Sequence, residues 1–246
     1  MFIPLDATFI PYLIIGGVAM LLGLAASAYV KLRFMRGTRI SLGSGLSGAE
    51  IAEAILRHEG IHDVRVEPHQ GFLSDHYHPG RKVLALSPDV YHGRHAAAAG
   101  VAAHEVGHAL QHARGDLTMW GRTILVYPAH FGSMIAPYLV MAGLALGAAQ
   151  GLAQGSFAYW LAISGLVLFG VSTLCSLIIV INEFNASARA RAALVDLRVI
   201  RPGTDEDSTV RGVLTAAGLT YVASAITSLL YLLYFAYLVF GRRDER

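Results

Sequence analysis

The chain has 246 residues, of which 54% are hydrophobic and 15% are charged, and its mean hydropathy of +0.51 is high for a soluble protein. The net charge of +2 does not imply a nucleic-acid partner, and a single cysteine excludes a disulfide framework within the chain. These numbers favour an integral membrane protein that has the lipid bilayer as a partner and binds no nucleic acid.

Four apolar stretches are long enough to cross a bilayer, because a membrane-spanning helix needs about 20 residues with few charges. They are residues 8–30, 123–149, 156–181 and 213–240. The one Asp, Glu, Lys, Arg or His within them is His130, in the second stretch. The sequence therefore predicts about four transmembrane helices.

The distribution of basic residues predicts how the chain is oriented. Eleven of the nineteen Lys and Arg residues lie in 31–122 and five in 183–219, whereas none precedes residue 31. Cytoplasmic loops carry an excess of Lys and Arg, so both polar segments are expected in the cytoplasm. Four spans then place the C-terminal tail outside despite its three arginines, and a re-entrant last segment would remove this conflict.

A polar module, residues 34–122, lies between the first two spans. The capping box "SGAE", 47–50, begins a helix, and Gly60 ends it. Residues 63–68 alternate like a strand, and "KVLALS", 82–87, reads as a second strand after the predicted turn "DHYHPGR". This second strand is either an edge strand that pairs with an extended peptide or an ordinary sheet strand.

The sequence "HEVGH" lies on a long alanine-rich helix predicted over about 95–114. His104 and His108 stand one turn apart on one face, the spacing at which two imidazoles bind one tetrahedral zinc ion. Glu105, beside the first histidine, can then act as the general base. "HEGIH", residues 58–62, has the same pattern, but its helix is expected to end at about Gly60, so its histidines need not share a face.

A zinc site of this kind needs a third protein ligand. His112 is one turn further along the same face, but the metzincin pattern requires histidine at position 114, which is Arg114. Glu183 is the other candidate, because it is the only acidic residue near the end of a transmembrane stretch, where ionisable groups usually have a partner. A hairpin of the second and third spans would return it to the depth of the histidine helix. A solvated carboxylate at the membrane boundary is the alternative.

Two segments, "SPDVYHGRHAAAAGVAAHEVGHALQHA" and "NEFNASARARAAL", resemble the YugP-type membrane zinc metallopeptidases and, more distantly, the gluzincins of the HtpX kind. The resemblance covers most of the chain. It implies Zn²⁺ bound by His104, His108 and Glu183, with Glu105 activating the attacking water. Those relatives usually have aspartate four residues after the ligand glutamate, where this chain has Ser187, so the partner that orients the zinc histidines is not predicted.

The predicted fold is a mainly α membrane protein, with about four transmembrane helices and a small α+β zincin-like cytoplasmic module. Its predicted parts are a first transmembrane helix (1–33), the module with the histidine helix (34–122), a transmembrane hairpin (123–182), a cytoplasmic helix and loop with Glu183 (183–212), and a last transmembrane helix with the tail (213–246). The predicted function is a zinc endopeptidase in a bacterial plasma (inner) membrane. Its partners would be membrane proteins or juxtamembrane peptides as substrates, and the oligomeric state stays open.

Two other functions fit parts of the sequence. A membrane metal-binding or assembly protein could keep the fold without turnover, although it would need no base at Glu105. A metal transporter could use His130 as a relay, and it would need several polar groups that face one another inside the membrane. An oxyanion partner is expected for the peptidase. Five residues are candidates by type alone: His76, Tyr77, His78, Tyr91 and His130.

Overall fold

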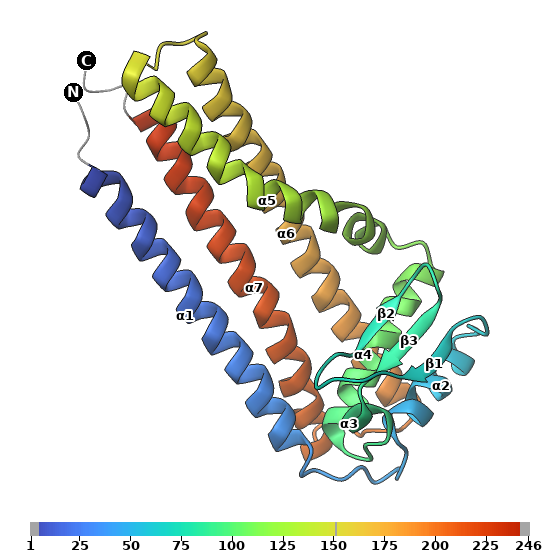
Figure 1. Cartoon of the computed structure of the whole chain (residues 1–246). Coiled ribbons are helices and arrows are strands. Elements are labelled where there is room, and N and C mark those ends of the chain that lie inside the picture. The colour runs from blue at the N-terminus through green and yellow to red at the C-terminus, as the bar shows by residue number, and fades with distance from the viewer. Residues whose placement is uncertain (1–4, 151, 242–246) are drawn as a thin grey trace. The chain divides into compact units, whose positions relative to one another are not determined.

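The computed structural model describes residues 5–150 and 152–241 (Figure 1). The helices and strands are, in chain order, α1 (Leu5–Gly37), α2 (Gly48–His58), β1 (Arg65–Pro68), β2 (His76–His78), β3 (Val83–Leu86), α3 (Pro88–Tyr91), α4 (Ala96–Ala113), α5 (Leu117–Gln150), α6 (Phe157–Asp196) and α7 (Asp205–Phe240). The chain divides into two compact units, which we describe separately. Unit 1 comprises 1–24, 121–180 and 221–246, and unit 2 comprises 25–120 and 181–220.

Four helices are long and apolar enough to cross a membrane: Ile10–Gly37, His130–Ala148, Phe157–Asp196 and Asp205–Phe240. They confirm the predicted fold class, a mainly α membrane protein with a small α+β module. α6 has 40 residues, and at about 1.5 Å per residue it is roughly 60 Å long, about twice the thickness of a bilayer core. The helix therefore continues well past its apolar part, and Glu183 lies on that continuation.

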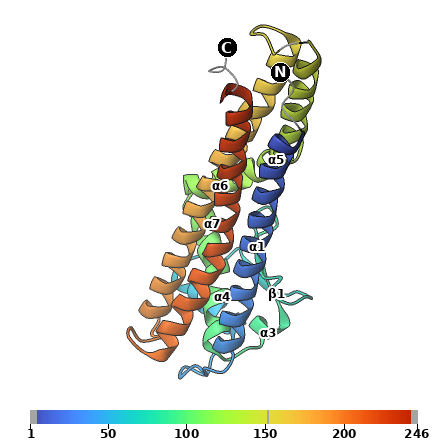
Figure 2. The ribbon, with the colours of Figure 1, turned by 90° about the vertical axis from the view of Figure 1, so that its left-hand side faces the viewer.

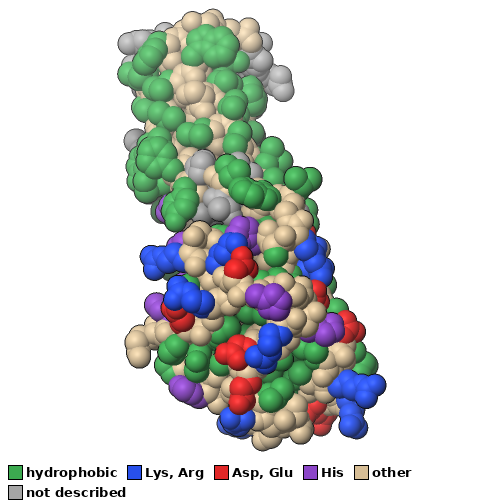
Figure 3. All heavy atoms as spheres, turned by 90° about the vertical axis from the view of Figure 1, so that its right-hand side faces the viewer, with side chains coloured by type: hydrophobic (Ala, Val, Ile, Leu, Met, Phe, Trp, Pro, Cys, Tyr) green, Lys and Arg blue, Asp and Glu red, His purple; other side chains and the backbone are tan. Residues whose placement is uncertain are grey.

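Unit 1 is a bundle of apolar helices, and Figures 1 and 2 show α5, α6 and α7 side by side within it. Its core joins Val140 of α5, Phe169 of α6 and Phe235 of α7. A Cβ atom at Gly165 would lie 2.8 Å from the carbonyl oxygen of Ala136, so glycine lets α5 and α6 approach closely. On the face drawn in Figure 3, apolar side chains cover unit 1 and charged side chains gather on unit 2.

Unit 2 contains a three-stranded sheet in the order β1-β3-β2, in which β3 runs parallel to β1 and antiparallel to β2. All four residues of β3 are buried, and they share a core with apolar side chains of α2 and α4. The predicted capping box is present, since Ser47 and Glu50 exchange hydrogen bonds of 2.7 and 3.3 Å. α2 ends at His58, and Gly60 follows it in the left-handed region with φ of 71°.

Of the two alternatives for "KVLALS", the ordinary sheet strand is confirmed. The segment supplies β3, which is the central strand, because β1 and β2 pair with its two sides. The prediction that "DHYHPGR" is a turn is wrong for its first half, which contains β2, so only its second half turns. Both outcomes depend on pairing between segments distant in the sequence, which local turn residues do not determine.

Candidate metal centre

α4 carries the two histidines of "HEVGH", and most of its surface is buried in unit 2. His95 caps the start of this helix, because its Nδ1 accepts a hydrogen bond of 3.0 Å from the amide of Ala98. This cap satisfies one of the amides that a helix leaves without a partner at its start. One turn apart, His104 and His108 are buried with their ring centroids 4.7 Å apart.

The carboxylate of Glu183 meets these two rings. Its Oε2 lies 3.1 Å from Nε2 of His104 and 3.6 Å from Nε2 of His108, although 79 residues separate it from His104. One ligand atom from each residue lies within 4.8 Å of the others, and all three side chains are buried. In a tetrahedral zinc site with bonds of about 2.0–2.2 Å, ligand atoms are roughly 3.3–3.5 Å apart. The two carboxylate–imidazole distances are therefore close to the spacing that one zinc ion requires.

Gly107, between the two histidines, explains how α6 comes so close to α4. A Cβ atom at this position would lie 2.6 Å from the carbonyl oxygen of Ala186 on α6. Only a residue without a side chain leaves room for that backbone, which carries Glu183 one turn earlier. The sequence contained this signal as a glycine inside a helix, but its partner could not be identified without the fold.

Each histidine also has a partner for its other ring nitrogen. Ser187 Oγ lies 3.2 Å from Nδ1 of His104, and Gln111 Oε1 lies 3.0 Å from Nδ1 of His108. Gln111 Oε1 also accepts a 3.1 Å hydrogen bond from Asn182 Nδ2, so this atom is the acceptor and His108 Nδ1 is the donor. The lone pair of His108 then lies on Nε2, which faces Glu183. Such partners fix the tautomer and the ring direction of metal-binding histidines.

Gln111 is fully buried and was missed by sequence reasoning. Its Nε2 donates to the carbonyl oxygen of Asn182 at 3.1 Å and to Oδ1 of Asn185 at 3.0 Å. The amide thus connects α4 to α6 on both of its polar atoms. Ser187, the position for which the sequence predicted no partner of the histidines, contacts His104.

Glu105 directly follows His104 on α4 and is only 9% exposed. Its Oε2 accepts a hydrogen bond of 3.0 Å from the backbone amide of Tyr77 on β2. The phenol of Tyr77 lies 2.8 Å from Nδ1 of His112, and burial raises the pKa of this phenol to about 12, so it stays protonated and can donate. β2 therefore holds Glu105 through its backbone and His112 through a side chain.

A half-buried carboxyl group, that of Asp75, fixes the start of β2. Asp75 accepts hydrogen bonds from the amide and the hydroxyl of Ser87, at 2.7 and 3.1 Å. Burial raises the pKa of Asp75, and the bonds from Ser87 oppose this rise. Since Ser87 directly follows β3, the pair joins the entry of β2 to the exit of β3.

A family model described as "Putative neutral zinc metallopeptidase" matches residues 12–240. The chain belongs to this family. It is also 40% identical to "Putative membrane protease YugP" of Bacillus subtilis (strain 168) over 220 residues, which are 88% of this chain and 91% of that protein. No solved structure matches the chain. The predicted resemblance to YugP-type membrane zinc metallopeptidases is thereby confirmed.

Membership of this metallopeptidase family implies Zn²⁺ as the cofactor, and the side chains fit it. Two imidazoles and a carboxylate are usual zinc ligands. The Nδ1 atoms of the two imidazoles, which face away from the carboxylate, are held by neighbouring residues. Among residues 5–150 and 152–241, no other group of three His, Cys, Asp or Glu side chains could hold a metal ion.

The other candidates lie apart from these three ligand atoms. His58 and His62 are exposed around the end of α2, as predicted for the second "HExxH" match. His76 is exposed and its Nδ1 lies 2.9 Å from the carbonyl oxygen of Ser74, whereas Nδ1 of His78 accepts from the amide of Arg81 at 3.2 Å. Tyr91 ends α3 in unit 2. The contacts of His76 and His78 are thus with nearby backbone groups, and they do not support either histidine as the oxyanion partner.

Proposed function

We propose that the chain is a membrane-embedded zinc endopeptidase in which His104, His108 and Glu183 bind the metal and Glu105 is the general base. The observation that supports it best is the approach of two imidazoles and a carboxylate within 4.8 Å, with Glu105 directly after the first histidine. Family membership supports the same reaction class. The zinc would supply a Lewis acid that polarises the scissile carbonyl and lowers the pKa of the attacking water.

The chain's own groups then handle the proton. Glu105 Oε2 is held by the amide of Tyr77 at 3.0 Å, which leaves Oε1 to take the proton of the water. The same carboxyl group would pass that proton to the leaving nitrogen. Ser187 and Gln111 keep the histidine rings from turning during these steps, because each bonds an outer ring nitrogen.

β2 offers a place for an extended substrate. It is an edge strand of the sheet, and Tyr77 directs its amide away from β3 and towards Glu105. In a strand the amide and the carbonyl of one residue point to the same side, so the carbonyl of Tyr77 faces this edge as well. Backbone pairing of a peptide with this edge would tolerate many sequences and bring its carbonyls beside Glu105.

The expected substrates are membrane proteins or their juxtamembrane segments. Four apolar helices make the chain an integral membrane protein, and we expect its site to lie close to the bilayer because α6 carries both an apolar stretch and Glu183. We propose that this bilayer is a bacterial plasma membrane and that the site faces the cytoplasm. The excess of Lys and Arg in 31–122 and 183–219 supports this orientation.

Substitution of the base tests the proposal. Glu105→Gln should keep stoichiometric zinc and lose cleavage of an unfolded protein such as casein, whereas Glu183→Ala should lose both. Glu53→Gln is the matched control, because its side chain is 50% exposed and paired only with Arg57. Cleavage by Glu105→Gln at the wild-type rate would refute the role of Glu105.

The metal-binding or assembly protein predicts a different result. Wild-type chain that binds one zinc ion per molecule and cleaves no casein or membrane-protein substrate would favour that alternative. No structural observation favours it, since Glu105 directly follows His104 and is fixed by the amide of Tyr77, and a site that only binds metal needs no base there.

A further inference from the structure

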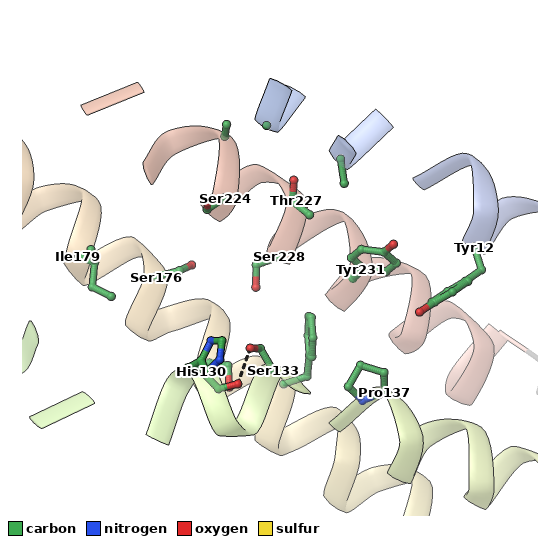
Figure 4. A pocket seen from close by; sticks show the side chains of 15 residues that line it. Tyr12, His130, Ser133, Pro137, Ser176, Ile179, Ser224, Thr227, Ser228 and Tyr231 are labelled. Atoms are coloured by element: carbon green, nitrogen blue, oxygen red, sulfur yellow. Dashed lines mark hydrogen bonds between the residues drawn. The ribbon is translucent and has the colours of Figure 1, made fainter. Parts of the chain in front are cut away.

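Unit 1 contains a cavity of about 670 Å³ that the peptidase site does not use (Figure 4). All four long helices line it. Eight of its fifteen lining residues carry a hydroxyl group, and one further polar residue is His130. The sequence shows these groups only as scattered residues in apolar spans. The fold brings them to one place.

The polar residues occupy single faces of their helices. Ser172 and Ser176 are one turn apart on α6, and Ser224, Thr227 and Ser228 share a face of α7. The opposite faces are apolar and exposed, with Leu174 at 62% on α6 and Leu229 at 44% on α7. These helices thus turn their hydroxyl groups, among apolar side chains such as Phe169 and Ile179, towards the cavity and apolar side chains alone towards the surroundings.

The cavity wall presents neutral hydrogen-bonding groups. Ser133, Ser172 and Ser176 donate to carbonyl groups of their own helices at 2.8, 3.0 and 2.7 Å, so each oxygen keeps acceptor capacity. Within the part of the chain that the structure describes, the imidazole of His130 has no hydrogen-bond partner, and this exposed residue lines the cavity. A polar group that faces hydrocarbon without a partner costs about 1–3 kcal/mol or more.

We propose that water fills this cavity inside the bilayer and that the cavity takes small neutral hydrogen-bonding ligands. At about 30 Å³ per molecule, its volume admits on the order of 20 waters. Water satisfies both His130 and the serine oxygens. None of the fifteen described residues that line the cavity is Asp, Glu, Lys, Arg, Cys or a second histidine, so these residues offer His130 no second metal ligand.

Cysteine accessibility in proteoliposomes tests this proposal. Cys175→Ala removes the natural thiol, and Ser176→Cys and Ser224→Cys place single thiols in the cavity. Leu174→Cys and Leu229→Cys are matched controls on the exposed apolar faces of the same helices. The probe is Ag⁺, which is small and does not enter hydrocarbon. The readout is protection from a fluorescent maleimide that is added after unfolding in detergent.

We expect Ag⁺ to protect the cavity thiols at least tenfold faster than the lipid-facing thiols. Ser44→Cys, on an exposed loop of unit 2, shows that the probe reaches water-exposed thiols. Cavity thiols that react as slowly as those at 174 and 229, while Ser44→Cys reacts fast, would overturn the proposal.

A second pocket, in unit 2, carries an independent inference. It has a volume of about 350 Å³ and is lined by residues of α1 and α7: Tyr29, Arg33, Ser208, Arg211, Gly212 and Thr215. Arg33 Nε donates to the hydroxyl of Tyr29 at 2.9 Å, and its guanidinium lies against α7, since a Cβ atom at Gly212 would be 3.2 Å from Nη1.

Positive charge exceeds negative charge at this pocket. Asp207 already accepts two bonds from Arg191, at 2.7 and 3.0 Å, and lies 3.7 Å from Arg211. Arg33 has no carboxylate partner in the described ranges 5–150 and 152–241. Two guanidinium groups, those of Arg191 and Arg211, therefore share one carboxylate, and Arg33 and Arg211 both line the pocket.

The position of the pocket along α1 and α7 identifies the source of the missing anion. Arg33 follows the apolar stretch 8–30, and Arg211 precedes the apolar stretch 213–240. Basic pockets between transmembrane helices at this depth bind lipid headgroups. We infer that this pocket binds the phosphate of an anionic phospholipid, with Arg33 and Arg211 as the charged contacts and the hydroxyls of Ser208 and Thr215 as neutral ones.

Native mass spectrometry of the purified chain with phosphatidylglycerol or phosphatidylcholine tests this inference. The double variant Arg33→Gln/Arg211→Gln should retain at least fivefold less phosphatidylglycerol than wild type. The double variant Arg57→Gln/Arg65→Gln should retain as much, because these side chains are 66% and 69% exposed on the surface of unit 2. Equal retention by both double variants would overturn the inference. Displacement of the lipid by equimolar inorganic phosphate would show a site for free phosphate instead.

Discussion

Substitution of Gly107 by alanine tests the contact that brings Glu183 to the histidines. The new Cβ atom would lie 2.6 Å from the carbonyl oxygen of Ala186 and 3.1–3.2 Å from its C and Cα atoms. Carbon–oxygen contacts are normally no closer than about 3.3 Å, so the two helices must separate by roughly 0.7 Å. All three atoms belong to the α6 backbone, which cannot rotate away as a side chain would.

Zinc sites do not tolerate a shift of this size. Ligand distances in real sites stay within about 0.2 Å of their usual values, so a 0.7 Å separation exceeds this tolerance about threefold. Gly107→Ala should therefore weaken zinc binding at least tenfold, or by about 1.4 kcal/mol. Helix propensity alone predicts that this variant is more stable than wild type, because replacing glycine by alanine within a helix stabilises the helix by about 1 kcal/mol.

Gly100→Ala on the same helix is the matched control. A Cβ atom there would meet Val210 at 3.7–3.8 Å, which is ordinary contact. We expect this variant to bind zinc like wild type and to unfold at the same or a higher temperature. Zinc affinity is measured by competition with a chelator, and stability by thermal unfolding of zinc-loaded and metal-free protein. Equal zinc affinity of the two variants would refute the reasoning.

Three further variants test neighbouring contacts. Gln111→Leu should weaken zinc binding about 10–100-fold in chelator competition, since it removes the partner of His108; unchanged affinity would contradict this. Ser187→Ala should weaken zinc binding about tenfold and Ser187→Asp should restore it, so equal affinities would count against that contact. Burial lowers the pKa of His95, so its contribution to stability is present above about pH 6.5 and is lost as the pH falls through the lowered value. In zinc-loaded protein, His95→Asn keeps a cap and should reduce acid destabilisation between pH 7.5 and 5; an unchanged pH profile of unfolding would refute this.

Much of the architecture could be predicted because its signals are local. Runs of apolar residues gave the four membrane helices, and the 3.6-residue period placed His104 and His108 on one face. Glu183 could be singled out because a carboxylate is costly at the end of an apolar helix. The structure brings it to the two rings, while its role as a ligand stays a prediction.

The missed features depend on contacts between distant segments. Gln111 is one polar residue on a helix until Asn182, 71 residues later, comes beside it. The order β1-β3-β2 depends on which strands pair, and β2 is too short to show a period. Ser176 and Ser224 each lie on a polar face of their helix, which the sequence shows. These two faces meet around one cavity only when the helices pack into the bundle.

The fixed amide of Gln111 has a consequence for how His108 binds an ion. Because Asn182 and Asn185 determine which end of the amide faces His108, that imidazole is held in the tautomer whose lone pair lies on Nε2. Loading would then require little reorganisation of α4. Deamidation of Gln111 would replace the group that donates to Asn185 with an acceptor. This change of one side chain would release the His108 tautomer before it affected the fold.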